Sequence, residues 1–570
     1  MNQTMVTCDP NRTLLHRFLH WEAHTPNEIY LTQPYLEANL KESVVDYSWA
    51  EVGRQARSMA AYLRTLDLPS GSSIALLGKN SAHWIMADLA IWMAGHVSVP
   101  IYPTLNAETT SYIVRHADVK LVFVGKIDGK SDGWTAAQQG IPPGLPIVSL
   151  PLSPCKNVAE WDVLIGQREP LQDLPDPEPG QVATIIFTSG STGNPKGAMH
   201  TFGSMVAAAV SLGRLYEMSQ HERMLSYLPL AHVAERAAVE ANSLYFGFRV
   251  FFTADLSTFQ ADVKRARPTM FFSVPRLWTR FYLGVLEKIP QRRQRLLFSL
   301  PIVSGVVKKI ILSGLGLDQT RTAVTGSAPL PPHIHEWFRN IGLELLDAYG
   351  MTENFAVSHA SCKGAVRTGY VGTPVPDVLC RIADDGEILV KSPGQMLGYW
   401  KQSGLNTEYI TADGYFHTGD RGEIDAQGRL RITGRSKEQF KTSKGEYVAP
   451  APIEQMLAEH PYIEAVCVLG SGQPQPFGLL TLSQDAQHSI ASGVTTGEAA
   501  SVELAALLDT TNSKLAPHER LSYVTVVNNQ WTVESGFLTP TLKIKRHVIE
   551  ERYLQSADAW LARHQKVIWE

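Results

Sequence analysis

One loop of the chain, TSGSTGNPKG at 188–197, combines small, hydroxyl and basic residues in an order suited to holding phosphate. It directly follows the apolar run VATIIF, as glycine-rich loops follow buried strands in many nucleotide-binding proteins. Glycines let backbone N–H groups approach an anion, while hydroxyls and a mobile lysine add donors and positive charge. Proline rather than glycine precedes Lys196, which departs from the usual triphosphatase spacing and indicates another phosphate chemistry. The predicted phosphate contacts are Thr188, Ser189, Gly190, Ser191, Thr192, Gly193 and Lys196.

The composition of the whole chain limits the classes of protein to which this loop can belong. With 570 residues, the chain is too long for one hydrophobic core, so two or more domains are expected. A formal net charge of -4 gives no reason to expect nucleic acid as a partner. The five cysteines form no CxxC pair, which argues against a disulfide framework and a structural zinc site. Since no secretory signal is visible at the N-terminus, we expect a cytoplasmic protein.

Alternating helical and strand-like patterns must position the loop. SSIALLG and VKLVFVG read as strands and ETTSYIVRHAD as a helix, an alternation that predicts parallel sheets with crossover helices. The most apolar stretch, 84–102, contains Asp88 and His96, so we expect a buried helix running into a strand rather than a membrane span. After about residue 380, short β runs alternate with Asp-Gly or Gln-Gly turns. The segment beyond Arg435 is long enough for a small α+β domain.

Six further segments, in order and spacing, give the chain a family resemblance. They are YLPLAHVAER at 227–236, GSAPL at 326–330, YGMTE at 349–353, YFHTGD at 415–420, GRSKEQFK at 434–441 and LTPTLKIKR at 538–546. With the opening loop, they resemble the adenylate-forming enzymes: acyl-CoA synthetases, luciferases and peptide-synthetase adenylation domains. The resemblance implies a large N-terminal domain of stacked, doubly wound α/β sheets with a β-subdomain (1–435). It also implies a small, mobile α+β C-terminal domain (436–570).

The resemblance implies a reaction in which a carboxylate attacks the α-phosphate of ATP. Two anions must then meet, so charge neutralisation and in-line positioning are the main catalytic demands. Glu353 resembles the family's magnesium ligand, with Thr188 as a second, and Thr352 resembles a phosphate contact. Lys543 resembles the lysine that bridges the acyl carboxylate and the α-phosphate, although Lys545 is close enough to compete for this role.

The nucleoside is expected to contact two groups of residues. Asp420 and Arg435 resemble the contacts to the ribose hydroxyls, and Ile432 lies nearby. The tyrosine of YGMTE supplies an aromatic face for stacking on a base. The predicted adenine and phosphate contacts are Gly326, Ser327, Ala328, Pro329, Asp347, Ala348, Tyr349, Gly350, Met351 and Thr352.

A second half-reaction on coenzyme A is implied by the segment around GRSKEQFKTSKGEYVAP. Lys437 falls at the family's interdomain hinge, where a large φ/ψ change accompanies domain rotation. Lys441 is expected to face the thioester-forming site, and Gly445 would let a pantetheine chain pass close to the backbone. The nucleophile is the thiol of coenzyme A, so no cysteine of the enzyme is required.

The acyl chain is the least specified ligand. TPT-x-K, TSKGEYVAPAPIE and SVPRLWTRFY look like long-chain fatty acyl-CoA synthetases, so we expect a medium- to long-chain fatty acid. His232 and Trp278 are candidates for the acyl tunnel; a structural histidine and a plain core tryptophan are the alternatives. The basic and aliphatic segment 291–312 suits a weak contact with the inner membrane face, but we favour a buried helix pair interrupted at Pro301.

Other functions stay open at this level. One is an acyl-AMP ligase, or a synthetase that acts on a carrier-bound or hydroxy-acid substrate without free coenzyme A. A more distant one is a non-catalytic sensor of acyl chains or nucleotides, which is disfavoured because all the charged site residues are present. A homodimer is a further expectation for the assembly.

Overall fold

The computed structural model describes residues 13–36, 42–127, 130–188, 194–532, 535–539 and 543–570. The chain divides into two compact units. The first takes in the described residues up to 380 together with 390–416, and the second takes in 381–389 and 417–570. Among the described helices, none is both long and apolar enough to cross a membrane. The doubly wound α/β fold expected from the sequence is confirmed, whereas the predicted domain boundary at 435/436 stays a prediction.

The strands that flank the loop of predicted phosphate contacts belong to an eight-stranded sheet in the first unit, ordered β19-β9-β8-β4-β3-β5-β6-β7. Strands β8, β4, β3, β5, β6 and β7 run parallel; at one edge β9 pairs antiparallel with β8, and β19 pairs antiparallel with β9. The strands are β3 (Ser73–Leu77), β4 (Val97–Ile101), β5 (Leu121–Val124), β6 (Ile147–Ser149), β7 (Ala159–Glu160), β8 (Val182–Thr188), β9 (Lys196–Thr201) and β19 (Gly398–Tyr399).

Helices connect the parallel strands of this sheet, as the sequence pattern predicts. They are α3 (Ala82–Met93), α4 (Ala107–His116), α5 (Lys130–Gln138) and α6 (Trp161–Gly166), and α2 (Trp49–Arg64) leads into the first of the strands. Every residue of α3 is buried, and β4 follows it directly. A helix that is apolar on all sides must be covered on all sides. The expected buried helix running into a strand is therefore confirmed for 84–102.

A second sheet of the first unit has the order β12-β13-β14-β15-β16, and its first three strands are parallel. Trp278 and Phe271 belong to one hydrophobic core cluster of this part of the chain. The elements are β12 (Met270–Ser273), α11 (Pro275–Lys288), β13 (Thr322–Gly326), α14 (Pro332–Asn340), β14 (Leu345–Tyr349), β15 (His359–Ala360) and β16 (Thr373–Pro374).

A third sheet, ordered β10-β11-β1-β2, joins the start of the chain to its middle. Its strands are β1 (Ile29–Leu36), β2 (Glu42–Ser48), β10 (Arg223–Ser226) and β11 (Arg249–Phe252). The helices nearby are α1 (Leu14–His24), α7 (Phe202–Tyr216), α8 (Val233–Glu235), a π-helix at Arg236–Ala241, α9 (Asn242–Phe246) and α10 (Phe259–Ala266).

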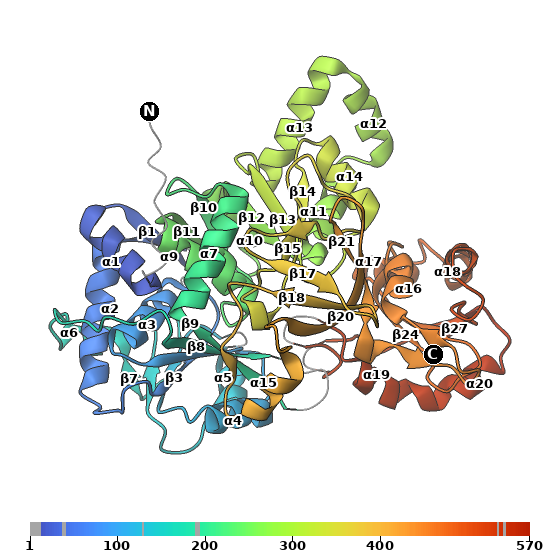
Figure 1. The fold of residues 1–570 in the computed structure, drawn as a ribbon. Helices are drawn as coiled ribbons and strands as arrows, with labels where there is room; N and C mark the ends of the chain where they lie inside the picture. Colours follow the sequence, from blue (N-terminus) through green and yellow to red (C-terminus); the bar gives the residue numbers. More distant parts are fainter. Residues whose placement is uncertain (1–12, 37–41, 128–129, 189–193, 533–534, 540–542) are drawn as a thin grey trace. The chain divides into compact units, whose positions relative to one another are not determined.

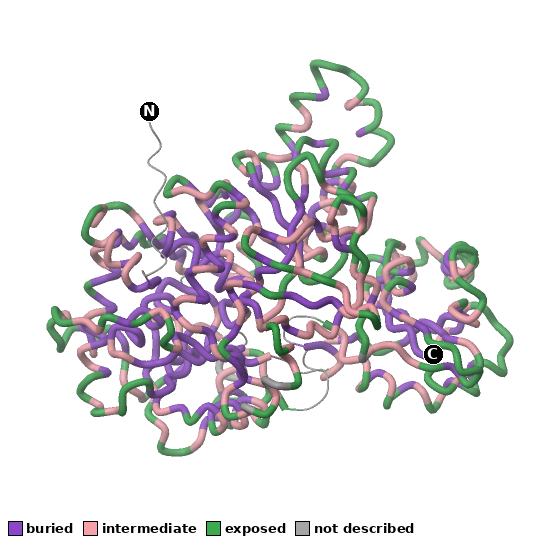
Figure 2. The backbone as a smooth tube through the Cα atoms, in the orientation of Figure 1, coloured by how far each residue is buried: buried purple, intermediate pink, exposed green. Residues whose placement is uncertain are grey.

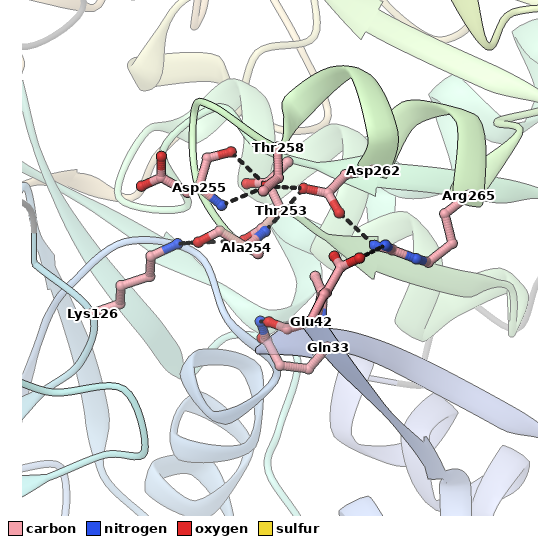
Figure 3. A network of polar contacts seen from close by, with 10 residues as sticks. Gln33, Glu42, Lys126, Thr253, Ala254, Asp255, Thr258, Asp262 and Arg265 are labelled. Carbon is pink, nitrogen blue, oxygen red and sulfur yellow. Dashed lines mark hydrogen bonds and ion pairs between the residues drawn. The ribbon is translucent and has the colours of Figure 1, made fainter. Parts of the chain in front are cut away.

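A network of polar contacts fixes the loop between β11 and α10 (Figure 3). The buried carboxylate of Asp262 accepts hydrogen bonds from Ala254 N at 3.0 Å and Thr258 Oγ1 at 2.7 Å. Arg265 pairs with Asp262 and with Glu42 of β2, at 2.5 Å in each case. Buried carboxylates are stable only when they are paired in this way. The network therefore ties α10 to the third sheet.

Two helices, α12 (Gln291–Ser299) and α13 (Pro301–Leu315), form a hairpin that projects from the first unit (Figure 1). Their inner faces contact the core of the second sheet, but their outer faces are exposed (Figure 2). The break at Pro301 is confirmed, since α13 begins there. The expectation that this is a buried pair is wrong, because apolar side chains on the outer faces have no protein cover.

The second unit contains a mixed four-stranded sheet, β24-β25-β26-β27, with two hydrophobic clusters against it. Its elements are α16 (Pro450–Leu457), β24 (Ile463–Leu469), β25 (Phe477–Leu482), α17 (Gln484–Ala491), α18 (Gly497–Ser513), β26 (Val524–Val526), α19 (Arg546–Tyr553), α20 (Ala557–Leu561) and β27 (Val567–Trp569). The short β runs predicted after residue 380 are β17 (Leu379–Ile382), β18 (Glu387–Lys391), β20 (Phe416–Ile424) and β21 (Leu430–Arg435), in one sheet. The α+β character expected beyond Arg435 is thus observed.

Candidate active site

The ends of the phosphate loop are held by an antiparallel pair of strands. Thr188, the last residue of β8, pairs with Lys196, the first of β9. The hydroxyl of Thr188 donates to the carbonyl of Lys196 at 3.4 Å. The predicted contacts at 189–193 lie outside the described residues, so their roles stay predictions. The two predicted phosphate contacts that the structure describes, Thr188 and Lys196, are placed side by side by the register of the sheet.

The side chain of Lys196 lies against two tyrosines. Its Nζ donates to the hydroxyl of Tyr409 at 3.0 Å and lies 4.5 Å from the centre of that ring. It is also 5.4 Å from the ring centre of Tyr399. Tyr409 ends α15 (Ser403–Tyr409), and Tyr399 lies in β19, next to β9. Aromatic faces attract a cation without neutralising it. The two rings therefore hold the lysine side chain in place, which suits its predicted role as a phosphate contact.

Glu353 lies in a short 3₁₀ helix, Thr352–Asn354, that follows β14. Its Oε1 accepts a hydrogen bond from the hydroxyl of Tyr399 at 2.8 Å, and its carbonyl accepts one from Met396 N at 2.7 Å. Burial and the nearby Glu353 carboxylate raise the pKa of Tyr399, so its phenol stays protonated and donates. One tyrosine thus lies beside both the predicted metal ligand and the loop lysine.

His200 fixes the backbone of the YGMTE turn by a hydrogen bond. Its Nε2 bonds to the carbonyl of Thr352 at 2.8 Å, and burial lowers the pKa of His200 to about 4. The imidazole is therefore neutral near pH 7 and adds no charge to the site. Gly350 is required in this turn, because a Cβ there would lie 2.3 Å from the carbonyl oxygen of Ala356. The turn presents Thr352 and Glu353 on one tightly folded segment.

The predicted adenine contacts gather at the carboxyl ends of β13 and β14. Gly326 pairs with Ala348 in the parallel register, so GSAPL and YGMTE leave the sheet as neighbours. Such strand ends are the usual ligand sites of open α/β sheets. The residues brought together are Gly326, Ser327, Ala328, Pro329, Asp347, Ala348, Tyr349, Gly350 and Met351.

Asp347 has a partner that the sequence did not indicate. Its Oδ1 lies 3.3 Å from Nε2 of His335, a buried residue of α14. Its Oδ2 is buried and accepts no hydrogen bond from the described residues. The side chain is therefore oriented by His335 and retains an acceptor, which suits an amino group of a base.

The two acyl-tunnel candidates occupy different surroundings. His232 caps α8, and its Nδ1 accepts a hydrogen bond from Ala234 N at 3.2 Å. Trp278 is fully buried, with its ring edge-on to Phe271 and Phe338 at 5.5 and 5.0 Å. The core role left open for Trp278 is thus observed, and the tunnel roles of both residues stay predictions.

The predicted ribose contacts lie in the second unit, where they touch each other. Asp420 of β20 and Arg435 of β21 are directly paired across the antiparallel strands. Arg435 Nε lies 2.9 Å from Oδ1 of Asp420, whose side chain is almost fully buried. Ile432 lies on the same strand as Arg435 and pairs with Gly422. A fixed carboxylate of this kind suits two adjacent hydroxyl donors.

The remaining lysines also belong to the second unit. Lys441 ends β22 (Phe440–Lys441), and its Nζ is 5.4 Å from the ring centre of Tyr447 in β23 (Tyr447–Val448). Between these strands Gly445 adopts φ 87°, a conformation that favours glycine. Lys437 lies in a 3₁₀ turn, Ser436–Glu438, directly after β21. The lysine assigned to the hinge therefore lies where one strand ends and the next short hairpin begins.

Lys543 is exposed at the end of a small loop. Its N–H donates to Thr539 Oγ1 at 3.0 Å, and its carbonyl accepts from Thr539 N at 2.7 Å. Lys545 instead caps α19, and its N–H donates to the carbonyl of Phe537. The backbone of Lys543 is therefore bonded to Thr539, whereas Lys545 lies at the start of α19.

The family follows from comparison of this chain with known proteins. The model of the AMP-binding enzyme family matches residues 18–400, and that of the AMP-binding enzyme C-terminal domain matches 437–565. The chain belongs to the AMP-binding enzyme family. The predicted family resemblance is therefore confirmed over most of the chain.

Relatives of this AMP-binding enzyme have similar lengths. It is 32% identical to the peroxisomal long chain acyl-CoA synthetase 6 of Arabidopsis thaliana, over 90% of this chain and 82% of the relative. It is 28% identical to the long-chain-fatty-acid–CoA ligase FadD15 of Mycobacterium tuberculosis, over 90% of this chain and 92% of the relative. The human long-chain-fatty-acid–CoA ligase 1 is 29% identical, over 85% and 78% of the respective chains.

Solved structures share the fold of the AMP-binding enzyme. The adenylation domain of a carboxylate reductase from Mycobacterium chelonae matches with a TM-score of 0.78 and 21% identity, over 97% of this chain and 92% of that one. An anthranilate CoA ligase in complex with anthranoyl-AMP matches with a TM-score of 0.77 and 19% identity, over 97% and 99%. At these identities, the likeness concerns the fold.

Two residues of the AMP-binding enzyme were missed by sequence reasoning. Tyr399 and Tyr409 contact Lys196, and Tyr399 also contacts Glu353, yet neither lies in a segment used for the family resemblance. The sequence offered one signal, for Tyr399: GYW follows an apolar β run. This position predicts a strand but does not indicate which residues Tyr399 contacts. Among the described residues, no three His, Cys, Asp or Glu side chains form a metal cluster. Besides the Thr188 hydroxyl, predicted as a second ligand, a metal at Glu353 would take ligands from a substrate, as Mg²⁺ commonly does from phosphates.

Proposed function

We propose that this AMP-binding enzyme activates a long-chain fatty acid with ATP and transfers the acyl group to coenzyme A. In the first step, a carboxylate oxygen of the acid attacks the α-phosphorus, and the bond to the β-phosphate breaks. Acyl-AMP forms and pyrophosphate leaves. In the second step, the thiolate of coenzyme A attacks the acyl carbon, the bond to AMP breaks, and the thiol proton passes to solvent. The products are acyl-CoA and AMP.

The observation that carries the proposal is the placement of Lys196 and Glu353 around Tyr399. A cation and a carboxylate lie on neighbouring elements, at the end of a strand that leads into a glycine-rich loop. Lys196 supplies positive charge to the departing phosphates, and Glu353 supplies an oxygen ligand for a divalent cation. When bound, Mg²⁺ neutralises charge on the phosphates as the two anions meet. The relatives named as long-chain acyl-CoA synthetases support the choice of acid and acceptor.

Residues of the second unit have proposed roles in both steps. Asp420 and Arg435 bind the ribose, and Lys543 holds the acyl carboxylate against the α-phosphate. Lys441 and the turn at Gly445 serve the thioester step, with Lys437 at the hinge. In the first unit, His232 and Trp278 are assigned to the acyl side. The proposal also includes a cytoplasmic location for the protein and its assembly as a homodimer.

The test is a panel of carboxylic acids of graded chain length, incubated with the full chain, ATP, Mg²⁺ and coenzyme A. Mass spectrometry follows AMP and the acyl thioester. We expect both products in equal amounts, with fatty acids preferred over acetate. Pyrophosphate release without a thioester would contradict the coenzyme A step and indicate an acyl-AMP ligase. Gel filtration tests the homodimer separately.

A further inference from the structure

The outer faces of α12 and α13 carry a concentration of exposed apolar side chains. Among the described residues, eighteen large apolar side chains are exposed, and six of them fall within 296–310. Their exposed fractions run from 38% at Val303 to 86% at Ile302. An exposed group of this kind on a folded protein marks an interaction site more often than chance. The six are Leu296, Leu300, Ile302, Val303, Val306 and Ile310.

The apolar side chains of α13 form one stripe along the helix. Ile302, Val306 and Ile310 follow one another at four-residue intervals, so they lie on one face. The opposite face carries the buried Ile311 and Leu315, which pack into the core of the first unit. The helix is thus apolar on both sides, although only one side is covered by this chain.

The same segment is strongly basic. Residues 288–317 contain six lysines and arginines and no aspartate or glutamate, in a chain whose net charge is -4. Arg292 and Arg295 lie on the exposed side of α12, on the same face as Leu296, and Lys309 is exposed beside the stripe of α13. Within the described part of the chain, no ion pair involves these three cations. The surface therefore combines aliphatic side chains with uncompensated positive charge.

The hairpin is held firmly at its base. Gln294 is buried, its Oε1 accepts a hydrogen bond from Trp337 Nε1 at 2.8 Å, and its Nε2 donates to the carbonyl of Ile289 at 2.7 Å. The bond from Trp337 fixes α12 to α14, and the buried Ile311 and Leu315 hold α13 in the same core, so the outer faces cannot turn inward without breaking these contacts. The exposed face is a fixed feature of the first unit.

We propose that the α12–α13 hairpin docks the protein on the surface of an anionic lipid bilayer. Aliphatic side chains flanked by arginine and lysine suit this surface, since the former enter the boundary between headgroups and acyl chains and the latter pair with lipid phosphates. Charge complementarity favours this partner over a second copy of the chain, because two such hairpins would bring like charges together. The inference concerns location and does not depend on the acid that the enzyme uses.

The test is cosedimentation of the full chain with phosphatidylcholine vesicles, with and without phosphatidylglycerol. Binding is expected only to the vesicles with phosphatidylglycerol, and it should weaken as salt is added. The variant Ile302→Ser/Val306→Ser/Ile310→Ser and the variant Arg292→Gln/Arg295→Gln/Lys309→Gln should each reduce binding at least about tenfold. Val494→Ser/Val502→Ser, which changes comparably exposed side chains of the second unit, should bind as the wild type does.

Three results would overturn the proposal. The first is that the wild type does not sediment with anionic vesicles. The second is that both hairpin variants bind these vesicles as tightly as the wild type. The third is that sedimentation equilibrium shows a dimer that the serine variant no longer forms, while neither protein binds vesicles, which would make a second copy the partner. Because the changed side chains are exposed, the thermal unfolding of each variant should match that of the wild type, which excludes misfolding as the cause.

Discussion

The hydroxyl of Tyr399 donates a hydrogen bond to Oε1 of Glu353 at 2.8 Å, and the same ring lies 5.4 Å from Nζ of Lys196. The tyrosine is fixed by its strand, because Tyr399 pairs with Ala198 of β9. A neutral donor therefore orients the carboxylate without cancelling its charge. This arrangement gives the predicted metal ligand and the predicted phosphate-binding lysine a shared support.

Removal of the Glu353 carboxylate should affect catalysis far more than removal of its support. We expect Glu353→Gln to lower the rate of acyl-AMP formation at least about 100-fold, because a charged oxygen ligand is lost. Tyr399→Phe should keep the ring beside Lys196 and lose only the hydrogen bond, so we expect mainly a higher requirement for Mg²⁺. Pyrophosphate release at graded Mg²⁺ measures both. Equal Mg²⁺ dependence in Tyr399→Phe and the wild type would contradict the orienting role.

Lys543 and Lys545 can be separated by the two half-reactions. Lys543→Ala should lower acyl-AMP formation by about 100-fold or more, since a cation at the reacting centre is lost. It should leave thioester formation from supplied acyl-AMP near the wild-type rate. Lys545→Ala is the matched control, because it removes an equal charge two residues away at the start of α19. If Lys545→Ala rather than Lys543→Ala blocks adenylation, the assignment of the lysine is wrong.

Trp278→Ala should destabilise the first unit. The ring is fully buried between Phe271, Phe281 and Phe338, so we expect the free energy of unfolding to fall by about 3–5 kcal/mol. Urea unfolding followed by fluorescence measures the change. Trp278→Phe keeps an aromatic ring and should cost less, which allows its activity to be measured. A changed preference among acids of different length in Trp278→Phe would support the proposed acyl-tunnel role as well.

Glu235 should make the stability of the first unit depend on pH. Burial raises the pKa of this carboxyl from its ordinary 4.5 to about 8, against the opposing hydrogen bonds from Ser226 and Tyr227. The folded state then keeps a proton that the unfolded state has released. This contribution is full below about pH 4.5 and is lost as the pH rises toward 8, by at most about 1.4 kcal/mol per pH unit.

Urea unfolding of the wild type and Glu235→Gln between pH 5 and pH 9 tests this dependence. The amide keeps the shape of the side chain and does not ionise, so the variant should lose this part of the decline in stability. Parallel curves for the two proteins would show that Glu235 is ionised in the folded state. Since other groups titrate equally in both proteins, the difference between the curves isolates this carboxyl.

Local sequence patterns were enough for much of the fold. The alternation of apolar runs and helical periods predicted β3, α4, β5 and the helix-to-strand passage at 84–102, because each pattern depends on neighbours in sequence. The family resemblance also implied that GSAPL and YGMTE contribute to one adenine site, and the strand ends at Gly326 and Ala348 are neighbours in the structure.

Features that depend on distant packing were not accessible in this way. Tyr399 meets Glu353 because β19 joins the edge of β9, a pairing between segments about 200 residues apart that no local period encodes. The hairpin at 291–315 was misjudged for a related reason. Apolar residues on both sides of a helix indicate burial by default, and only the arrangement of its neighbours shows that one side is uncovered.

The pairing of β1 with β11 has a consequence for how the protein is made. Val250 follows Leu31 by 219 residues, yet the two are neighbours in the same parallel ladder. At ordinary rates of translation, β1 leaves the ribosome roughly 10 to 40 seconds before its partner strand exists. During that interval the β1–β2 hairpin has an open edge of unpaired backbone groups, which is a template for aggregation. Faster synthesis or the cover of a chaperone over residues 29–48 should therefore raise the yield of folded protein more than changes to the second unit would.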